Sequence, residues 1–197
     1  MTDYIASDLD ADAKNSWGTD PLIFAAINSE FNFSLDAAAS EINHLVPNFY
    51  TKENNALTAD WNANLIAYQE FYGNAKALNK NVFVNPPYGR GLIQKFMQKA
   101  VEEKAKGVTT VMLVPATLDA QWIPLHDISE IRIITGGRLS FIHPLTGKKI
   151  AGNTKGSMFV IFKPSRMPLI TRYENRDELL VIGQQELDRN NALERAA

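Results

Sequence analysis

Apolar and polar residues follow one another along the chain in blocks whose spacing distinguishes strands from helices. Short apolar runs predict strands near residues 31–35, 45–50, 82–84, 109–114, 131–134 and 157–162. Apolar residues three or four positions apart predict helices near residues 21–30, 62–80, 92–107 and 177–195. Strands separated by helices are typical of a parallel sheet covered by helices, so the pattern predicts an α/β fold.

The helix expected within 62–80 is rich in aromatic residues. Tyr68, Phe71 and Tyr72 recur there at helical spacing. Apolar residues at such spacing usually face a core, so we expect these three to be packed inside, with an exposed surface that faces a binding partner as the alternative. The helix at 92–107 has a clear apolar face, and we expect its charged residues on the opposite, exposed face: Lys95, Lys99, Glu102 and Glu103.

The composition narrows the range of possible chemistries. The chain has 197 residues, 45% of them hydrophobic, which favours one main domain with a sizeable core. It has no cysteine, which excludes thiol catalysis, disulfides and cysteine-ligated zinc. The three histidines are far apart in sequence, so no metal site is expected. No apolar run is long enough to cross a bilayer and no secretory signal is visible, so we expect a cytoplasmic protein without a membrane partner.

Charge is unevenly distributed around a formal net value of −2. Residues 1–16 hold four aspartates and one lysine, which predicts a mobile acidic arm. Residues 144–176 hold seven basic residues and one acid, whereas residues 177–197 hold five acids and two arginines. A basic segment can bind phosphate groups or form a solvated loop, and the sequence favours neither. We expect a domain at 17–164 and a polar, partly helical extension at 165–197, which packs on the domain or on a second subunit; the sequence leaves the oligomeric state open.

The residues directly after the strand expected at 82–84 have a specific chemistry: Asn85, Pro86, Pro87 and Tyr88. Proline has no backbone N–H, and Pro87 keeps Pro86 extended, so the carbonyl groups of this turn are available as acceptors. The Asn85 side-chain oxygen and the Pro86 carbonyl can accept both hydrogens of a planar exocyclic amine and direct its lone pair toward an electrophile. Tyr88 offers a face on which a flipped base can stack. An ordinary proline turn is the alternative, but strand, tetrapeptide and helix occur in the order that such a site requires.

This tetrapeptide matches the NPPY motif of amino-group methyltransferases that use S-adenosylmethionine, and residues 17–164 resemble the phage-type DNA N6-adenine methyltransferases. Further matches are Trp17-Gly18-Thr19-Asp20-Pro21, with one residue more than the family's Trp-x-Thr-Pro signature, an Asp-x-Ala-Ala element at 36–39, and a Gly-Arg-Leu-x-Phe element at 137–141. The resemblance implies a methyltransferase domain with a Rossmann-like class I fold, whose doubly wound sheet is mostly parallel with an antiparallel last strand. It implies transfer of a methyl group from S-adenosylmethionine to the N6 amino group of adenine in DNA.

The resemblance also implies which residues bind the cofactor. A helix that begins at Pro21 offers its N-terminus to a carboxylate such as that of methionine, and Thr19 or Asp20 can cap this helix. By resemblance, Asp36 lies against the amino group of the cofactor, and an acidic or amide residue past the next strand suits the ribose hydroxyls. The cofactor-binding candidates are Trp17, Thr19, Asp20, Asp36, Ala37, Ala38, Glu53, Asn55 and Asn85.

Contacts with DNA are expected from the aromatic residue of the motif and from basic residues after it: Tyr88, Arg90, Arg138, Lys148, Lys149 and Lys155. Two other functions stay open at this point. The same acceptors can orient an adenine in RNA or the amide of a protein glutamine, and the chain can also be a DNA-binding remnant without catalysis. For a phage-encoded enzyme, the expected location is the cytoplasm of the bacterial host.

Overall fold

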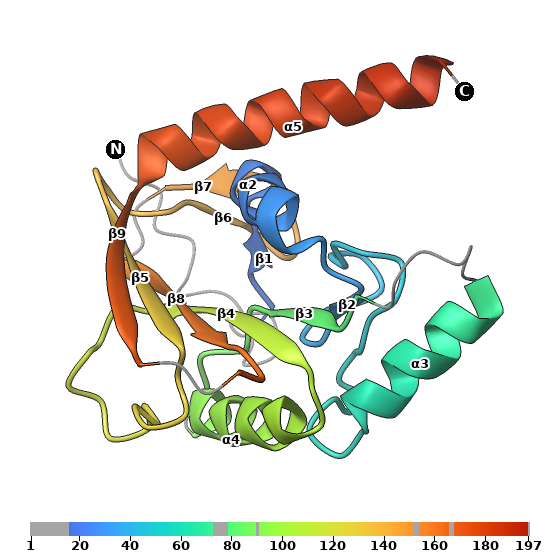
Figure 1. Cartoon of the computed structure of the whole chain (residues 1–197). Helices are drawn as coiled ribbons and strands as arrows, with labels where there is room; N and C mark the ends of the chain where they lie inside the picture. Colours follow the sequence, from blue (N-terminus) through green and yellow to red (C-terminus); the bar gives the residue numbers. More distant parts are fainter. Residues whose placement is uncertain (1–15, 73–78, 90, 152–153, 166–167, 197) are drawn as a thin grey trace.

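A computed structural model describes residues 16–72, 79–89, 91–151, 154–165 and 168–196. Almost all of the expected acidic arm at 1–16, and Arg90 among the expected DNA contacts, lie outside the described residues. The described residues form an α/β fold with a central mixed sheet between helices (Figure 1). The helices are α2 (Pro21–Phe31), α3 (Trp61–Tyr72), α4 (Leu92–Ala105) and α5 (Arg176–Ala196). None of the described helices combines the length and the apolar character that a membrane span requires.

The central sheet has six strands in the order β2-β3-β4-β8-β5-β9. Its strands are β2 (Leu35–Asp36), β3 (Asn81–Val84), β4 (Thr109–Pro115), β5 (Glu130–Thr135), β8 (Ser157–Phe162) and β9 (Ile170–Asn175). β8 runs antiparallel to both of its neighbours, and the other described pairs are parallel. The carboxyl ends of β2, β3 and β4 therefore meet at one edge of the sheet, which is where ligands bind in α/β proteins.

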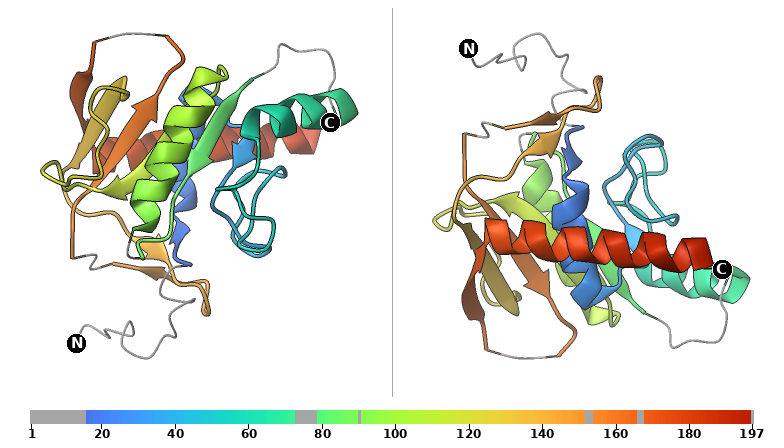
Figure 2. Two further views of the ribbon diagram at one scale, coloured as in Figure 1. Left: turned by 90° about the horizontal axis from the view of Figure 1, so that it is seen from below. Right: turned by 90° about the horizontal axis from the view of Figure 1, so that it is seen from above.

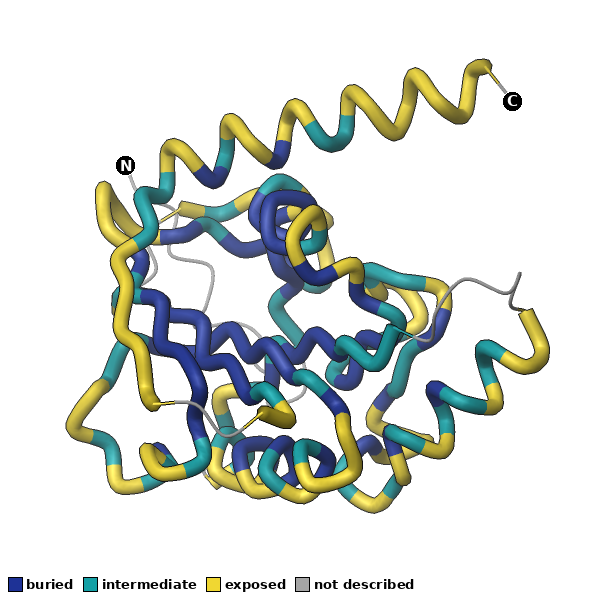
Figure 3. Tube along the Cα trace, in the orientation of Figure 1, coloured by how far each residue is buried: buried dark blue, intermediate teal, exposed yellow. Residues whose placement is uncertain are grey.

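Both faces of the sheet are covered, which explains why its inner strands are continuously apolar. Along β4, Met112 and Val114 face the cluster built with α3 and α4, whereas Val111 and Leu113 face α2. This alternation follows from the two-residue period of a strand. Figure 3 shows the central strands buried over most of their length.

A smaller sheet links the start of the described chain to its middle. It has the order β1-β6-β7, with β1 (Gly18–Thr19), β6 (Phe141–Ile142) and β7 (Lys149–Ile150). β1 pairs antiparallel with β6, so Thr19 lies opposite Phe141. This pairing brings the Trp17 segment next to the Gly-Arg-Leu-x-Phe element, more than a hundred residues away in the printed sequence.

The helices expected at 21–30 and 92–107 are confirmed, but two expected strands are shorter. Phe31 still belongs to α2, which ends at Asn32 in a left-handed conformation (φ 50°), so the strand expected at 31–35 is reduced to β2. The strand expected at 45–50 is reduced to one parallel bridge between Asp36 and Phe49. Pro47 lies in this segment, and a residue without an N–H cannot continue a ladder.

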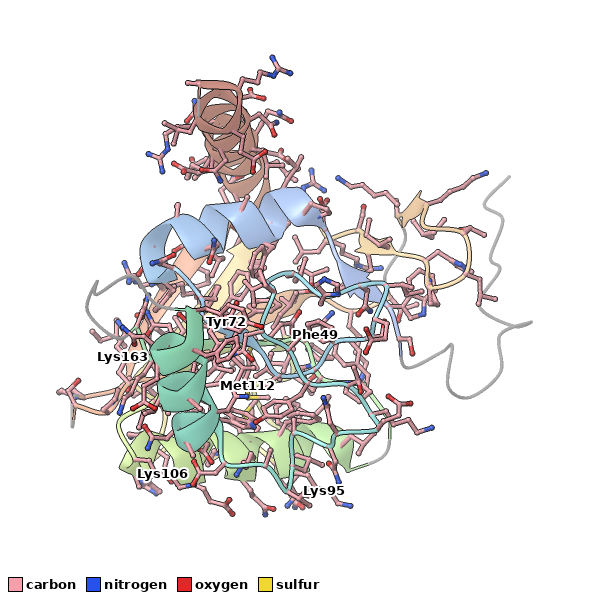
Figure 4. All side chains as sticks on the ribbon, turned by 90° about the vertical axis from the view of Figure 1, so that its right-hand side faces the viewer. Phe49, Tyr72, Lys95, Lys106, Met112 and Lys163 are labelled. Carbon is pink, nitrogen blue, oxygen red and sulfur yellow. The ribbon has the colours of Figure 1, made fainter. Side chains whose placement is uncertain are left out.

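The prediction of a buried aromatic face at 62–80 was wrong for Phe71 and Tyr72. Only Trp61 and Leu65 of α3 are buried, and the Phe71 side chain is 80% exposed. The last turn of α3 extends away from the central strands (Figure 1), and Tyr72, labelled in Figure 4, is the last residue of the helix. Helical spacing alone does not reveal which part of a helix another element covers.

The expectation that the charged residues of α4 are exposed was also wrong for two of them. Lys99 and Glu103 are buried and form an ion pair of 2.7 Å. Glu103 also accepts hydrogen bonds from Lys106 (2.9 Å) and from the backbone N–H of Asn62 at the start of α3 (3.1 Å). These residues thus attach α3 to α4.

The segment expected to be a polar extension contributes to the fold through β9 and α5. The first half of α5 crosses α2, as the view from above shows (Figure 2), and its buried residues are Leu179 and Gly183. A Cβ atom at Gly183 would lie 1.9 Å from the carbonyl oxygen of Leu22, so glycine permits this close crossing. Of the two arrangements that the sequence allowed for this helix, the structure shows packing on the domain.

Candidate active site

The Asn85–Tyr88 segment begins where β3 ends, at the edge of the sheet to which β2 and β4 also point. The Asn85 Nδ2 group donates a hydrogen bond to the backbone oxygen of Trp17 (3.1 Å). A carbonyl oxygen can only accept, so this bond determines the orientation of the Asn85 amide. Its Oδ1 is turned away from that carbonyl, and no described residue donates to it.

The rest of the motif contributes a buried proline and a partly exposed tyrosine ring. Pro86 is buried, and the Tyr88 ring packs edge-on against Phe141 with their centroids 6.5 Å apart. The Tyr88 side chain is 40% exposed, yet desolvation raises the pKa of its phenol above the ordinary value. Tyr88 is therefore neutral at physiological pH, and its ring lies at the surface beside the motif's carbonyl groups.

Trp17 is held in place by a residue that the sequence did not single out as functional, His143. The two rings meet edge to face, with centroids 5.0 Å apart. His143 Nδ1 accepts hydrogen bonds from the backbone N–H groups of Leu145 and Thr146 (3.2 Å each), so the ring proton belongs to Nε2. A histidine two residues after Phe141, in a chain with only three histidines, was the available signal.

The two candidates just before α2 have different surroundings. Asp20 caps the helix, since its Oδ1 accepts from the Leu22 N–H (3.1 Å), and its Oδ2 forms an ion pair with Lys149 Nζ. The N-terminus of α2 thus receives a carboxylate of the chain itself, and Lys149, expected to contact DNA, binds a residue expected to contact the cofactor. The Thr19 hydroxyl is buried and has no hydrogen-bond partner among the described residues.

Asp36 lies at the carboxyl end of β2, one strand away from Asn85. It is buried, and its oxygens accept hydrogen bonds from the backbone N–H groups of Ala38 (3.3 Å) and Leu45 (3.1 Å). Desolvation raises the pKa of Asp36 to about 6 despite these bonds. The next residue, Ala37, donates its N–H to the Phe83 carbonyl (2.9 Å) and so ties this loop to the NPPY strand.

Glu53 and Asn55 lie in an exposed turn that follows the Asp36–Phe49 bridge. Asn55 has a left-handed backbone (φ 43°), a conformation that asparagine tolerates better than most residues. Its Oδ1 accepts from the Leu57 N–H (3.2 Å), so the side chain is used within its own turn. The structure therefore places both residues on the side of β2 that lies away from β3.

The remaining basic candidates lie on the loops after β5, β6 and β7. Arg138, Lys148 and Lys155 are exposed. Lys148 lies next to β7 in the connection between β6 and β7, where the His143 N–H donates to its backbone oxygen (2.9 Å). Since β6 pairs with β1, this connection belongs to the same small sheet as the Trp17 segment.

The comparisons with known proteins agree with one another. A family model described as DNA N-6-adenine-methyltransferase (Dam) matches residues 6–186. A DNA N-6-adenine-methyltransferase of Haemophilus phage HP1 (strain HP1c1) is 32% identical over 156 residues, which are 77% of this chain and 80% of the phage protein. A DNA N-6-adenine-methyltransferase of Escherichia phage T1 is 30% identical over 167 residues, which are 76% of this chain. The chain spans only 63% of the length of that T1 protein.

Proposed function

The chain belongs to the DNA N-6-adenine-methyltransferase (Dam) family, and on that premise we propose that it transfers a methyl group from S-adenosylmethionine to N6 of adenine in DNA. One observation supports this activity above the others. The Asn85 amide is bound through Nδ2 to the Trp17 carbonyl, so Oδ1 remains an acceptor at the carboxyl end of β3. A preorganised acceptor at this position supports the proposed role of the motif.

The proposed chemistry uses Asn85 and Pro86 as acceptors and Tyr88 as a stacking surface. When bound, S-adenosylmethionine supplies an electrophilic methyl group. Asn85 Oδ1 and the Pro86 carbonyl accept the two N6 hydrogens, which directs the nitrogen lone pair toward that methyl carbon. As the N–C bond forms and the S–C bond breaks, N6 becomes positively charged and readily loses a proton to water. A strong general base is therefore not required.

The residues near Asn85 fit the cofactor. Thr19 offers a buried hydroxyl without a described partner, and Asp36 offers a buried carboxyl that forms no ion pair with the described residues. We propose that Asp36 holds the ammonium group of S-adenosylmethionine, where a positive charge offsets the desolvation of the carboxylate. Ala37 and Ala38 are small enough to let the ligand approach the backbone. Trp17, Glu53 and Asn55 remain proposed contacts, whereas we assign Asp20 to capping α2.

The proposed fold is the Rossmann-like class I methyltransferase fold with a doubly wound sheet. The order β2-β3-β4-β8-β5, with β8 as the reversed strand, supports it, as do the site residues at the carboxyl ends of β2 and β3. For DNA, we propose base stacking on Tyr88 and phosphate contacts from Arg138, Lys148 and Lys155. Both relatives are phage proteins, so we propose the bacterial host cytoplasm as the location.

The decisive variant is Asn85→Ala. We expect kcat for methyl transfer to DNA to fall by about 100- to 1,000-fold, as for the loss of one preorganised polar group in other enzymes. The dissociation constant of S-adenosylmethionine, measured by calorimetry, should stay within about threefold of the wild-type value, since Asn85 acts mainly on the substrate amine. Asn191→Ala makes the same chemical change on the exposed end of α5 and should leave both quantities unchanged.

The assay should supply labelled S-adenosylmethionine together with DNA, RNA and a glutamine-containing protein fraction in parallel. Label in N6-methyladenine of DNA is the expected result. Label confined to RNA or protein would contradict the proposed substrate. Near-normal turnover by Asn85→Ala would contradict the role of Asn85, even if DNA is the substrate.

A further inference from the structure

β9 is an edge strand whose outer side has no partner among the described residues. It pairs in parallel with β5 on one side only and is the outermost strand in the described sheet (Figure 1). Four of its six residues are exposed, and the Tyr173 side chain is 73% exposed. Long exposed edges are usually shortened, covered or paired, because their backbone groups invite another strand. This edge therefore requires an explanation that the proposed enzymatic activity does not supply.

The direction of each backbone group in β9 follows from its pairing with β5. The Ile170 N–H donates to the Ser129 carbonyl (3.1 Å), and the register continues with Arg132 opposite Arg172. In a parallel ladder, alternate residues direct both backbone groups to the same neighbour. Ile170, Arg172 and Glu174 therefore bind β5. Thr171 and Tyr173 direct their N–H and C=O groups outward.

The side chains of β9 are self-complementary about Tyr173. If a second copy of β9 is placed antiparallel with Tyr173 opposite Tyr173, Arg172 of each copy lies opposite Glu174 of the other. Within its own chain Arg172 also binds Glu130, and Glu174 lies 3.6 Å from Arg132, so the facing pair would join these ion pairs across the contact. Opposite charges at facing positions stabilise a strand pair, and like charges destabilise it. In the same register, the outward backbone groups of Thr171, Tyr173 and Asn175 face one another, as an antiparallel ladder requires.

The neighbouring registers lack this complementarity. A second copy can form a ladder only in registers in which residues with outward backbone groups face one another. Centring the pair on Arg172 places two guanidinium groups opposite each other, and centring it on Glu174 does the same for two carboxylates. Centring it on Thr171 leaves Arg172 opposite Ile170 and removes Asn175 from the ladder. Charge and backbone direction thus favour one register.

We propose that two copies of this chain associate through β9, related by a two-fold axis at Tyr173, so that the two sheets join into one continuous sheet. The contact is isologous, as most homodimer interfaces are. Leu169, which precedes the strand, and Ile170, its first residue, are partly exposed and lie within the contact. This association does not depend on the methyltransferase activity, so the two proposals can fail separately.

Cysteine cross-linking tests both the association and its register, because the chain has no cysteine of its own. In the proposed dimer, the two Cα atoms of residue 173 are about 5.5 Å apart, which a disulfide can span. In Thr171→Cys, the two thiols are four strand positions apart, roughly 13 Å along the ladder, which a disulfide cannot span. We expect Tyr173→Cys to form a covalent dimer under mild oxidation at least about tenfold faster than Thr171→Cys, since only its thiols meet.

Sedimentation of full-length protein supplies the second measurement. Wild type should sediment as a dimer at micromolar concentration, and Tyr173→Pro as a monomer. This proline removes an N–H that points outward and is not used within the chain, and edge strands tolerate proline at such positions. A cooperative thermal unfolding transition of the Tyr173→Pro monomer would show that the fold is intact. A monomeric wild type, or equal cross-linking of the two cysteine variants, would overturn the proposal.

Discussion

Asp36 and Glu130 are two equally buried carboxyl groups in opposite halves of the same sheet, with 2% and 3% of their surface exposed. Asp36 ends β2 beside the candidate active site, and its oxygens bind only backbone N–H groups. Glu130 begins β5 and binds the side chains of Arg132, Arg172 and Lys163. Burial raises the pKa of Asp36 to about 6. Burial also acts on Glu130, but its bonds to the three basic residues outweigh it and lower the pKa.

The difference lies in where the compensating charge comes from. Around Glu130, three basic side chains of the chain itself bind the carboxylate, and Arg132 in turn binds both oxygens of Glu30 of α2 (2.6 Å each). Asp36 forms no ion pair with the described residues, and the nearby His44 lowers its pKa by less than desolvation raises it, while the Thr19 hydroxyl has no described partner. Perturbed groups cluster at functional sites, but structural ion-pair networks perturb pKa values as well. The two carboxyl groups differ in whether basic side chains of the chain itself form ion pairs with them.

The largest effect expected from this comparison is on the free energy of unfolding, through the ion pairs around Glu130. Arg132→Met should lower the free energy of unfolding by about 3–5 kcal/mol, because it leaves buried Glu130 and its neighbour Glu30 without their shared cation. Arg172→Met is the matched control. Since about half of the Arg172 side chain is exposed, its removal should cost at most about 1 kcal/mol. Urea unfolding measures both, and equal costs would show that the network is not organised around Arg132.

The next effect concerns the pH dependence of stability caused by Asp36. Its pKa is about 6 in the folded protein and 3.8 for an ordinary aspartate, so the folded state binds more protons between these values. The contribution of Asp36 to stability should be complete below pH 4 and lost as the pH rises through 6. The total loss should be roughly 3 kcal/mol.

Urea unfolding of wild type and Asp36→Asn across this pH range isolates the Asp36 contribution, since the variant cannot titrate there. The stability of wild type relative to Asp36→Asn should decline from pH 4 to pH 6 and then level off. If Asp36 holds the ammonium group of the cofactor, saturating S-adenosylhomocysteine should reduce this decline, because the ammonium stabilises the ionised form. A relative stability that rises with pH would contradict the raised pKa of Asp36 in the folded protein.

The smallest effect distinguishes Lys148 and Lys149, two adjacent lysines at the connection between β6 and β7. Lys149→Met should lower the free energy of unfolding by about 0.5–1 kcal/mol, because Lys149 forms an ion pair with Asp20 at the start of α2. Lys148→Met should leave stability unchanged, since Lys148 forms no ion pair with the described residues. Lys148→Met should instead weaken DNA binding and reduce its salt slope by roughly 1, as expected for one lost phosphate contact.

Filter binding at several salt concentrations, together with urea unfolding, measures both lysine variants. If Lys149→Met reduces the salt slope as much as Lys148→Met does, Lys149 leaves Asp20 to contact DNA. If neither variant changes the salt slope, the connection between β6 and β7 does not bind the DNA phosphates.

The features that depend on neighbours in the sequence could be predicted well. α2 and α4 were expected within two residues of their observed ends, because cap residues and helical spacing are local signals. The resemblance implied an antiparallel last strand. β8 is antiparallel to its neighbours, but β9 follows it in the chain and runs parallel to β5. The exposed Phe71 and the buried pair Lys99–Glu103 could not be predicted, because their burial depends on whether another element lies beside them. The connection of His143 to Trp17 was missed for the same reason.

The sequence by itself determined that an amide and two prolines end a strand, and hence that the chain presents carbonyl acceptors at a sheet edge. These properties belong to the covalent chemistry of Asn85, Pro86 and Pro87 and to their immediate neighbours. Only the tertiary structure decided which way the Asn85 amide points, because its partner Trp17 is 68 residues away and reaches it through the pairing of β1 with β6. Likewise, Asp36 and Glu130 are both carboxyl groups near strand ends, and only their folded surroundings give them opposite pKa shifts, since burial and neighbouring charges are properties of the packed chain.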